Sequence, residues 1–91
     1  MLTASYTVRF KKDLKLMDKR GINMRKIFIV MTDLQNEVPL QSKHRVHQLT
    51  GNYKGFMECH VEPDWLLIYK IDLQTEEILF VRTGTHSDLL E

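Results

Sequence analysis

The sequence predicts an α+β fold in which an N-terminal strand and an antiparallel helical hairpin pack on an antiparallel sheet of about four strands. Apolar residues in the first half recur three and four positions apart, which is typical of amphipathic helices. The second half holds strand-like runs separated by short turns, which is typical of antiparallel hairpins. The 91 residues suffice for one core, so we expect a single domain over residues 1–91.

A short strand and a first helix are expected at the start of the chain. Residues 6–10 alternate between polar and apolar side chains and predict the strand. Residues 11–20 follow with helical spacing, and Gly21 can end this helix because glycine adopts positive φ at little cost. Asn23 can then cap a second helix through its side-chain oxygen. The apolar stripe of the first helix consists of Phe10, Leu14 and Met17.

The second helix has the clearest periodicity in the chain and is expected to end at Pro39. Ile29 and Val30 widen its apolar face, so we expect this helix to be well buried. A tight turn joins it to the first helix, which predicts an antiparallel pair. Its apolar stripe consists of Met24, Ile27, Phe28, Met31, Leu34 and Val38.

The second half is expected to form the sheet. Pro63 and Asp64 make one short turn, and residues 73–76 make another. A short helical turn is expected after Gly84. The expected strands span residues 46–50, 55–62, 65–72 and 77–83.

The register of the hairpin around Pro63 decides which side chains face the helices. Pairing of Glu62 with Trp65 would place His60 and Trp65 together, away from the core, although a bulge at the turn would shift this register. The helix-facing side would then carry Met57, Cys59, Val61, Leu66 and Ile68. The opposite side would carry Glu58, His60, Glu62, Trp65, Leu67 and Tyr69.

Charge and composition narrow the classes of protein. Residues 1–45 carry ten Lys or Arg against four acids, whereas residues 46–91 carry three against eight, which gives +6 and −5 and the net +1. The basic half is compatible with contact to RNA, but for charge alone a solvated helix surface is the better explanation. No run is long enough to cross a bilayer, and the N-terminus lacks a signal-peptide core. The single Cys59 excludes an internal disulfide and fits a reducing cytoplasm.

Two separated motifs and one supporting segment carry a resemblance to a known family. The first motif is His60–Lys70, in which an imidazole, two carboxylates and an indole surround a proline. The second motif is Arg82–His86, and the supporting segment is Val46–Gly55. Together they resemble the YafQ family of bacterial toxins within the RelE/ParE superfamily. The resemblance implies a single RelE-like toxin domain and an mRNA interferase of a type II toxin–antitoxin system.

The same resemblance implies the partners. A cognate antitoxin of the DinJ/RelB-like type would hold the toxin inactive, and operator DNA would be bound only through that antitoxin. The substrate would be mRNA, cut mostly on the ribosome, where the lysine-rich first helix could contact RNA phosphates. No cofactor, metal or membrane is implied, and a cytoplasmic location is expected.

Elementary chemistry shows what RNA cleavage requires. The ribose 2′-OH attacks the adjacent phosphate, which needs a base, an acid at the leaving oxygen and positive charge near the phosphoryl oxygens. Histidine suits the proton transfers because its ordinary pKa lies near neutrality. Arginine suits the phosphate because its planar fork stays charged. The chain offers both residue types.

The resemblance assigns roles to individual residues. His86 corresponds to the general acid, and Arg82 to the arginine that stabilises the phosphate. His47, His60 and Asp64 match further active-site positions, of which His47 or Asp64 is favoured for proton abstraction. Substrate-binding positions are Trp65, which could pack against RNA or shape the pocket, and Lys54. The family ends in an aromatic residue that can stack on a base, whereas this chain has Leu89-Leu90-Glu91.

Other interpretations remain open at this point. The chain could be a ParE-like toxin that binds gyrase, or a non-catalytic binding module of the same fold. A zinc site is also conceivable, although Cys59 and His60 are strand neighbours and should point to opposite faces. Asp64 could be an ordinary turn residue, Trp65 a core residue and Arg82 an edge charge. The proposed zinc ligands would be Cys59, His60, His47 and His44.

Overall fold

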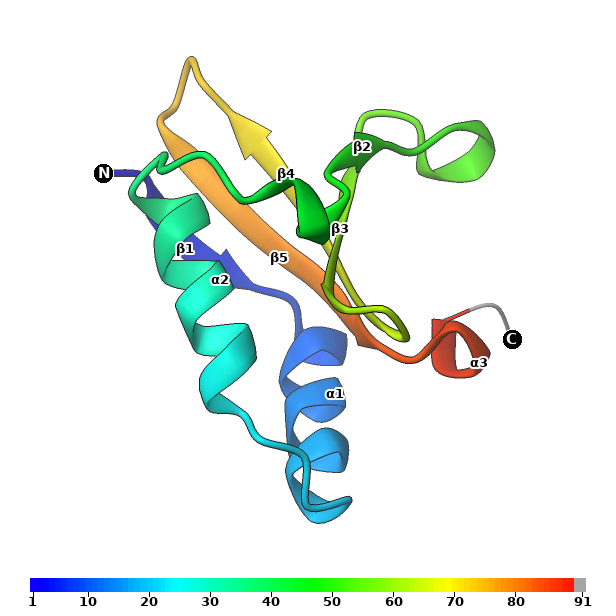
Figure 1. Cartoon of the computed structure of the whole chain (residues 1–91). Helices are drawn as coiled ribbons and strands as arrows, with labels where there is room; N and C mark the ends of the chain where they lie inside the picture. Colours follow the sequence, from blue (N-terminus) through cyan, green and yellow to red (C-terminus); the bar gives the residue numbers. More distant parts are fainter. Residues whose placement is uncertain (90–91) are drawn as a thin grey trace.

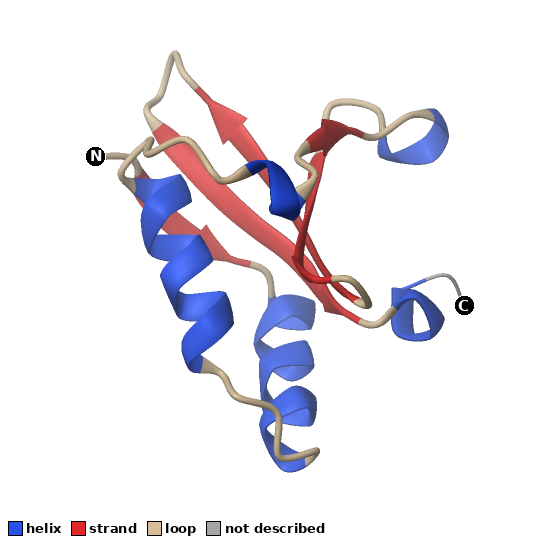
Figure 2. Cartoon of the chain, in the orientation of Figure 1, coloured by secondary structure: helices blue, strands red, loops and turns tan. Residues whose placement is uncertain are grey.

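The computed structural model describes residues 1–89 and shows one five-stranded sheet with a helical hairpin on one face (Figures 1 and 2). The strand order is β1-β5-β4-β3-β2; β1 runs parallel to β5, and the other neighbours are antiparallel. The α+β prediction is confirmed, and the N-terminal strand joins the same sheet as its fifth member. The strands are β1 Thr3–Tyr6, β2 His47–Gln48, β3 Met57–Glu62, β4 Trp65–Asp72 and β5 Glu77–Gly84. The helices are α1 Val8–Lys19, α2 Arg25–Gln35 and α3 His86–Leu89, with 3₁₀ turns at Ser42–His44 and Gly51–Tyr53.

The first strand and helix begin earlier than predicted. The strand ends at Tyr6, and Thr7 caps α1 because its Oγ1 accepts a hydrogen bond of 2.9 Å from the backbone N–H of Phe10. The alternation over residues 6–10 was therefore wrongly interpreted as a strand, since it spans the cap and the first helical turn. The early end of β1 leaves the second half of β5 without a neighbouring strand on this side.

The second helix is shorter and more exposed than predicted. It ends at Gln35, and Glu37 adopts a left-handed conformation with φ of 59° before Pro39 is reached. The side chain of Asn23 binds the N-terminus of α2 as expected, because its Oδ1 accepts a hydrogen bond of 3.1 Å from the backbone N–H of Arg25. Burial of the whole apolar face was a wrong prediction, since Phe28 is 49% and Ile29 60% exposed.

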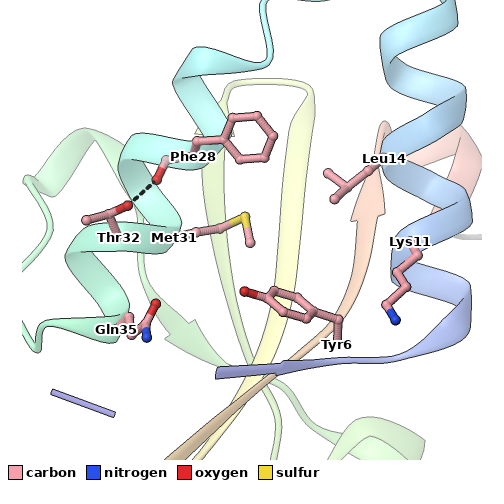
Figure 3. Close-up of a pocket in the computed structure, with 7 residues that line it drawn as sticks. All are labelled: Tyr6, Lys11, Leu14, Phe28, Met31, Thr32 and Gln35. Atoms are coloured by element: carbon pink, nitrogen blue, oxygen red, sulfur yellow. Dashed lines mark hydrogen bonds between the residues drawn. The ribbon is translucent and has the colours of Figure 1, made fainter. Parts of the chain in front are cut away.

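A shallow groove separates α1 from α2 above the end of β1. Its cavity volume is about 330 Å³, and its walls are mainly apolar (Figure 3). Phe28 and Met31 enter it from α2, Leu14 from α1, and Tyr6 closes one end. Lys11 lies at the rim of the groove.

One apolar core lies between the helices and the sheet. Residues of α1 and α2 meet residues of β3, β4 and β5 in this core. The buried rings of Phe10 and Phe80 stack on each other and on the partly exposed ring of Tyr6 at the edge of the core. Within residues 1–89, no helix has the length and apolar character needed to cross a membrane. The most deeply buried side chains include Phe10, Met17, Ile27, Cys59, Leu67, Tyr69, Ile78 and Phe80.

The hairpin of β3 and β4 departs from the expected faces. Glu62 pairs with Trp65 as predicted, but a bulge between His60 and Glu62 shifts the register, so that His60 lies opposite Leu66. A shift of the register by one residue exchanges the two faces of β4 relative to those expected. The core face of β4 therefore carries Trp65, Leu67 and Tyr69, and the opposite face carries Leu66 and Ile68, which is the reverse of the prediction. His60 remains on the face opposite the core, as predicted.

Candidate active site

Three histidines form a row on the sheet side away from the core. His47 comes from β2, His60 from β3 and His86 from the first residue of α3. The ring centroids of His47 and His60 are 6.2 Å apart, and those of His60 and His86 are 5.9 Å apart. Strand pairing and the turn after β5 therefore unite three residues that are distant in sequence. We call these three residues the histidine row.

Asp64 fixes one end of the histidine row. Its Oδ1 accepts from the backbone N–H of His86 at 3.0 Å and contacts the imidazole Nδ1 at 2.5 Å. The backbone N–H of His86, followed by its side chain, lowers the pKa of Asp64 below the ordinary value. An ionised carboxylate can only accept, so Nδ1 of His86 carries the hydrogen of this bond. The other nitrogen, Nε2, remains available for proton exchange with a substrate.

The other two rings are oriented by backbone carbonyls. Nδ1 of His60 donates to the carbonyl of Pro63 at 3.2 Å, and Nδ1 of His47 donates to the carbonyl of Arg45 at 2.7 Å. A carbonyl cannot donate, so both Nδ1 atoms carry hydrogen. The outward nitrogens of the two rings are again the ones that can exchange protons.

Glu58 is a site residue that sequence reasoning missed. Its Oε1 lies 3.2 Å from Nε2 of His47; Glu58 pairs with His47 across the sheet and precedes His60 by two residues on β3. Donor atoms of these three residues all lie within 4.8 Å of one another. The available signal was the two-residue spacing of Glu58 and His60, which puts both on one face of a strand.

Arg82 lies on the same face and is held by a carboxylate from α1. The register places it in one cross-strand row with Ile68, Glu58 and His47. Its Nε and Nη2 donate to Asp13 at 2.8 and 3.3 Å, and this hydrogen bonding to the Asp13 carboxylate raises the pKa of the guanidinium. Within residues 1–89, Nη1 makes no protein hydrogen bond, so this edge of the fork can face a phosphate.

A buried network ties Arg82 to the core. Trp65 Nε1 donates to Thr83 Oγ1 at 2.9 Å, and Thr83 Oγ1 donates to the carbonyl of Leu66 at 2.7 Å. The backbone N–H of Thr83 donates to Asp13 at 3.1 Å. Trp65 is only 3% exposed, and its indole supports the strand beside Arg82, so of the two roles considered for it the structure favours shaping the site over packing against RNA. Sequence reasoning also missed Asp13, which has no local motif.

The remaining candidates lie around the histidine row rather than within it. Lys54 is exposed in the loop before β3, and its contact with substrate stays a prediction. His44 contacts the backbone carbonyl of His60 through Nδ1 at 2.6 Å. Cys59 is buried on the core side of β3, as expected for the strand neighbour of His60, and burial raises the pKa of its thiol to about 12. The zinc set that includes Cys59 is therefore excluded, and Leu90 and Glu91 lie outside the described residues.

A helical hairpin behind a five-stranded sheet, with histidines, carboxylates and an arginine on the other face, defines the class of small RelE-like toxins. The family model described as "Bacterial toxin of type II toxin-antitoxin system, YafQ" matches residues 2–91. The chain belongs to the YafQ family. This membership confirms the predicted family, the fold and the assignment to toxins of type II toxin–antitoxin systems.

Individual relatives agree over almost the whole chain. The mRNA interferase toxin YafQ of Escherichia coli strain K12 is 45% identical over 86 residues, which cover 92% of this chain and 90% of that protein. A metal-bound toxin from Helicobacter pylori has a TM-score of 0.91 and 42% identity, with 98% and 99% of the two chains covered. The toxin in the E. coli DinJ–YafQ complex has a TM-score of 0.89 and 41% identity, with 99% and 98% covered.

Proposed function

We propose that the chain is an mRNA interferase, an endoribonuclease toxin that cleaves mRNA through attack of a ribose 2′-OH on the adjacent phosphate. The observation that carries this proposal is the histidine row, which presents three imidazoles beside an arginine on one face. The E. coli relative with the same activity in its name supports it. This reaction needs proton transfer and charge stabilisation, and these side chains supply both without a metal ion. We also propose that residues 1–91 act as one domain, because the helices and the sheet share one core.

His86 is the proposed general acid. Asp64 holds Nδ1–H, so Nε2 can give its proton to the O5′ atom as the P–O5′ bond breaks. The products are a 2′,3′-cyclic phosphate and a 5′-hydroxyl. Asp64 is thereby an orienting residue, and its lowered pKa makes it a weak proton acceptor.

His47, paired with Glu58, is the proposed acceptor of the 2′-OH proton. The contact of 3.2 Å between Nε2 and Oε1 allows the carboxylate to stabilise the imidazolium that forms. His60 lies between the basic and the acidic group and can contact the reacting phosphate through Nε2. Of the two base candidates named from the sequence, this geometry favours His47 over Asp64.

Positive charge is expected to hold the phosphates. Arg82 can donate from Nη1 to a phosphoryl oxygen, and its fixed fork lowers the cost of orientation during the reaction. Lys54 is proposed to contact a neighbouring phosphate from its exposed loop. The basic residues of α1 are proposed to contact ribosomal RNA when the chain acts on the ribosome.

A cognate antitoxin of the DinJ/RelB-like type is the proposed protein partner. DinJ occupies this role for the E. coli relative. The groove between α1 and α2 can accept apolar side chains, and Lys11 lies at its rim (Figure 3). Lys15 and Arg25 line neighbouring hollows on the same helices. An amphipathic antitoxin segment with acidic residues fits such a surface. We further propose that the complex reaches operator DNA through the antitoxin and that the toxin acts in the cytoplasm.

The decisive experiment incubates the purified protein with mRNA, with and without ribosomes. We expect cleavage to 2′,3′-cyclic phosphate ends, and His86→Ala should lower the rate by about 10²- to 10⁴-fold. Ser87→Ala is the matched control, because Ser87 is exposed and adjacent on α3. Equal cleavage by wild type and His86→Ala would refute the catalytic assignment, and inhibition of gyrase supercoiling would support the ParE-like alternative.

A second function is favoured by the cluster of His47, Glu58 and His60. Two imidazoles and a carboxylate whose donor atoms lie within 4.8 Å form a suitable ligand set for Zn²⁺. A relative of this chain is described as metal-bound. We propose that a bound divalent ion inhibits cleavage, because its ligands are the proposed proton-transfer groups. Titration of cleavage with Zn²⁺ should show reversible inhibition that chelation relieves, and unchanged cleavage at saturating Zn²⁺ would contradict it.

A further inference from the structure

We propose that helix α1 is the positioning element of the active site, with Asp13 fixing Arg82 and Arg20 fixing, through Asp88, the helix that begins with His86. This inference rests on the proposed function, because it concerns the two residues assigned to the phosphate and to the leaving group. Neither Asp13 nor Arg20 touches the substrate in this scheme. Both are positioning residues.

The first contact replaces a missing strand. Because β1 ends at Tyr6, the edge of β5 beyond Phe80 is covered by α1 instead. The carboxylate of Asp13 lies at this edge and accepts from the backbone N–H of Thr83 as well as from Nε and Nη2 of Arg82. Three donors on one nearly buried carboxylate leave the guanidinium a single orientation.

The second contact holds the C-terminal helix. Arg20 donates from Nη1 and Nη2 to the two carboxylate oxygens of Asp88 at 2.8 and 3.0 Å. Asp88 also accepts from the backbone N–H of Thr85 at 2.9 Å. A helix of four residues has too few internal hydrogen bonds to fix its own direction. α3 is therefore held from two sides, by Asp64 of the hairpin turn and by Arg20 at the C-terminal end of α1.

Close packing between β5 and α3 also indicates that α3 is held in place. A Cβ atom at Gly84 would lie 2.9 Å from Cβ of Asp88, so the end of β5 and the side of α3 meet without spare room. A larger residue at this position would displace α3, and His86 with it.

The two contacts belong to one helix face. Asp13 lies within α1, and Arg20, seven positions later, is the residue that caps the C-terminus of this helix, so the two are about two helical turns apart and both project toward β5 and α3. A small cavity of 130 Å³ lies between these elements, and Asp13, Arg82 and Asp88 all line it. Movement of α1 would therefore displace the phosphate-binding group and the general acid together.

Stability alone does not account for this arrangement. Arg20 and Asp88 are partly exposed, and an ion pair in such a place contributes little to folding. A role in positioning predicts a loss of kcat that exceeds any loss of stability. It also predicts that the effect of Asp13 depends on the presence of Arg82.

The test is a double-mutant cycle on mRNA cleavage by the full chain, with kcat and KM measured separately. We expect Asp13→Asn to lower kcat by about 10- to 100-fold with a smaller change in KM, and to have no further effect in an Arg82→Ala background. Asp18→Asn is the matched control, an exposed carboxylate on another face of α1. Arg20→Gln should lower kcat by about three- to tenfold, and Arg20→Lys should restore part of it.

Each outcome separates the two hypotheses. Wild-type kcat for both Asp13→Asn and Arg20→Gln would overturn the inference, as would an Asp13→Asn effect of equal size with and without Arg82. Wild-type activity of Arg82→Ala and His86→Ala would instead overturn the proposed function. If Asp13→Asn fails to fold, the comparison of Arg20→Gln with Arg20→Lys tests the positioning role of α1 by itself, because Arg20 is exposed and both variants should fold.

Discussion

The histidine end of the site and the arginine end are held in different ways. The side chains of His47 and His86 are 47% and 48% exposed, and each ring is anchored through Nδ1 while Nε2 faces outward or a carboxylate. The side chain of Arg82 is only 19% exposed, and Asp13, Thr83 and Trp65 tie it to the core. The groups that we propose to change protonation thus lie where water can stabilise both the charged and the neutral state.

The difference follows from the cost of burying charge. A histidine in the interior would lose the solvation of its imidazolium, whereas an arginine keeps its charge and can be buried beside a carboxylate. The site therefore combines an exposed histidine end with a largely buried arginine end. Substitutions should separate the two: removal of a buried side chain that supports Arg82 should lower stability as well as rate, whereas changes in the exposed histidines should lower the rate with little loss of stability.

The largest expected effect is at Trp65. Trp65→Ala should lower the free energy of unfolding by about 3–5 kcal/mol, because it opens a cavity in the core and removes the donor to Thr83. His60→Ala should change it by less than about 0.5 kcal/mol while slowing cleavage. Urea denaturation measures both. Trp65→Phe should cost about 1 kcal/mol, since packing is largely kept and one hydrogen bond is lost. Equal losses in the free energy of unfolding for Trp65→Ala and His60→Ala would contradict the proposed difference between the two ends of the site.

A substitution of Glu58 tests the histidine end. Glu58→Gln should lower the cleavage rate by about 10- to 100-fold, because the neutral amide cannot stabilise the imidazolium of His47. Glu62→Gln is the matched control on the same strand, where the carboxylate contacts Lys26 at 3.0 Å instead of a histidine. Single-turnover cleavage measures the rate. A similar loss in both variants would indicate a general effect of charge and exclude a specific role for Glu58.

Asp64 should have a smaller effect at the other end of the histidine row. Asp64→Asn should slow cleavage by about tenfold, because an amide can offer N–H to Nδ1 of His86 and oppose the required tautomer. Asp72→Asn is the control, since Asp72 also accepts backbone N–H groups in a hairpin turn, from Gln74 at 3.0 Å. If the two variants behave alike, Asp64 serves only the turn.

Local patterns predicted the elements better than they predicted their contacts. The bounds of β4, Trp65–Asp72, were predicted correctly because turn residues flank a continuous apolar run. The start of α1 was missed because Thr7 continues an alternating pattern while acting as a cap. The bulge beside Val61 reversed the expected faces of β4, and a sequence does not fix which residue bulges.

The site shows the same limit. The histidines, Asp64 and Arg82 were named through the family resemblance, and the structure brings them onto one side of the sheet. Asp13 is 69 positions from Arg82 in the chain and belongs to an otherwise ordinary helix. Only the pairing of β1 with β5, which places α1 against the end of the sheet, reveals that contact. Periodicity reports which face a residue occupies, and it says nothing about its partner across the fold.

The smallest expected effect concerns Asp88 and the pH dependence of stability. Hydrogen bonds from Arg20, followed by that from the backbone of Thr85, hold the pKa of Asp88 well below its ordinary value. The unfolded chain therefore takes up this proton first as the pH falls, so the stabilisation is complete above about pH 5 and is lost below it. Denaturation from about pH 6 to about pH 3 should show a shallower decline in Asp88→Asn than in wild type. Parallel curves would mean that the ion pair between Arg20 and Asp88 is too weak to hold α3. In that case α1 would position Arg82 but not His86.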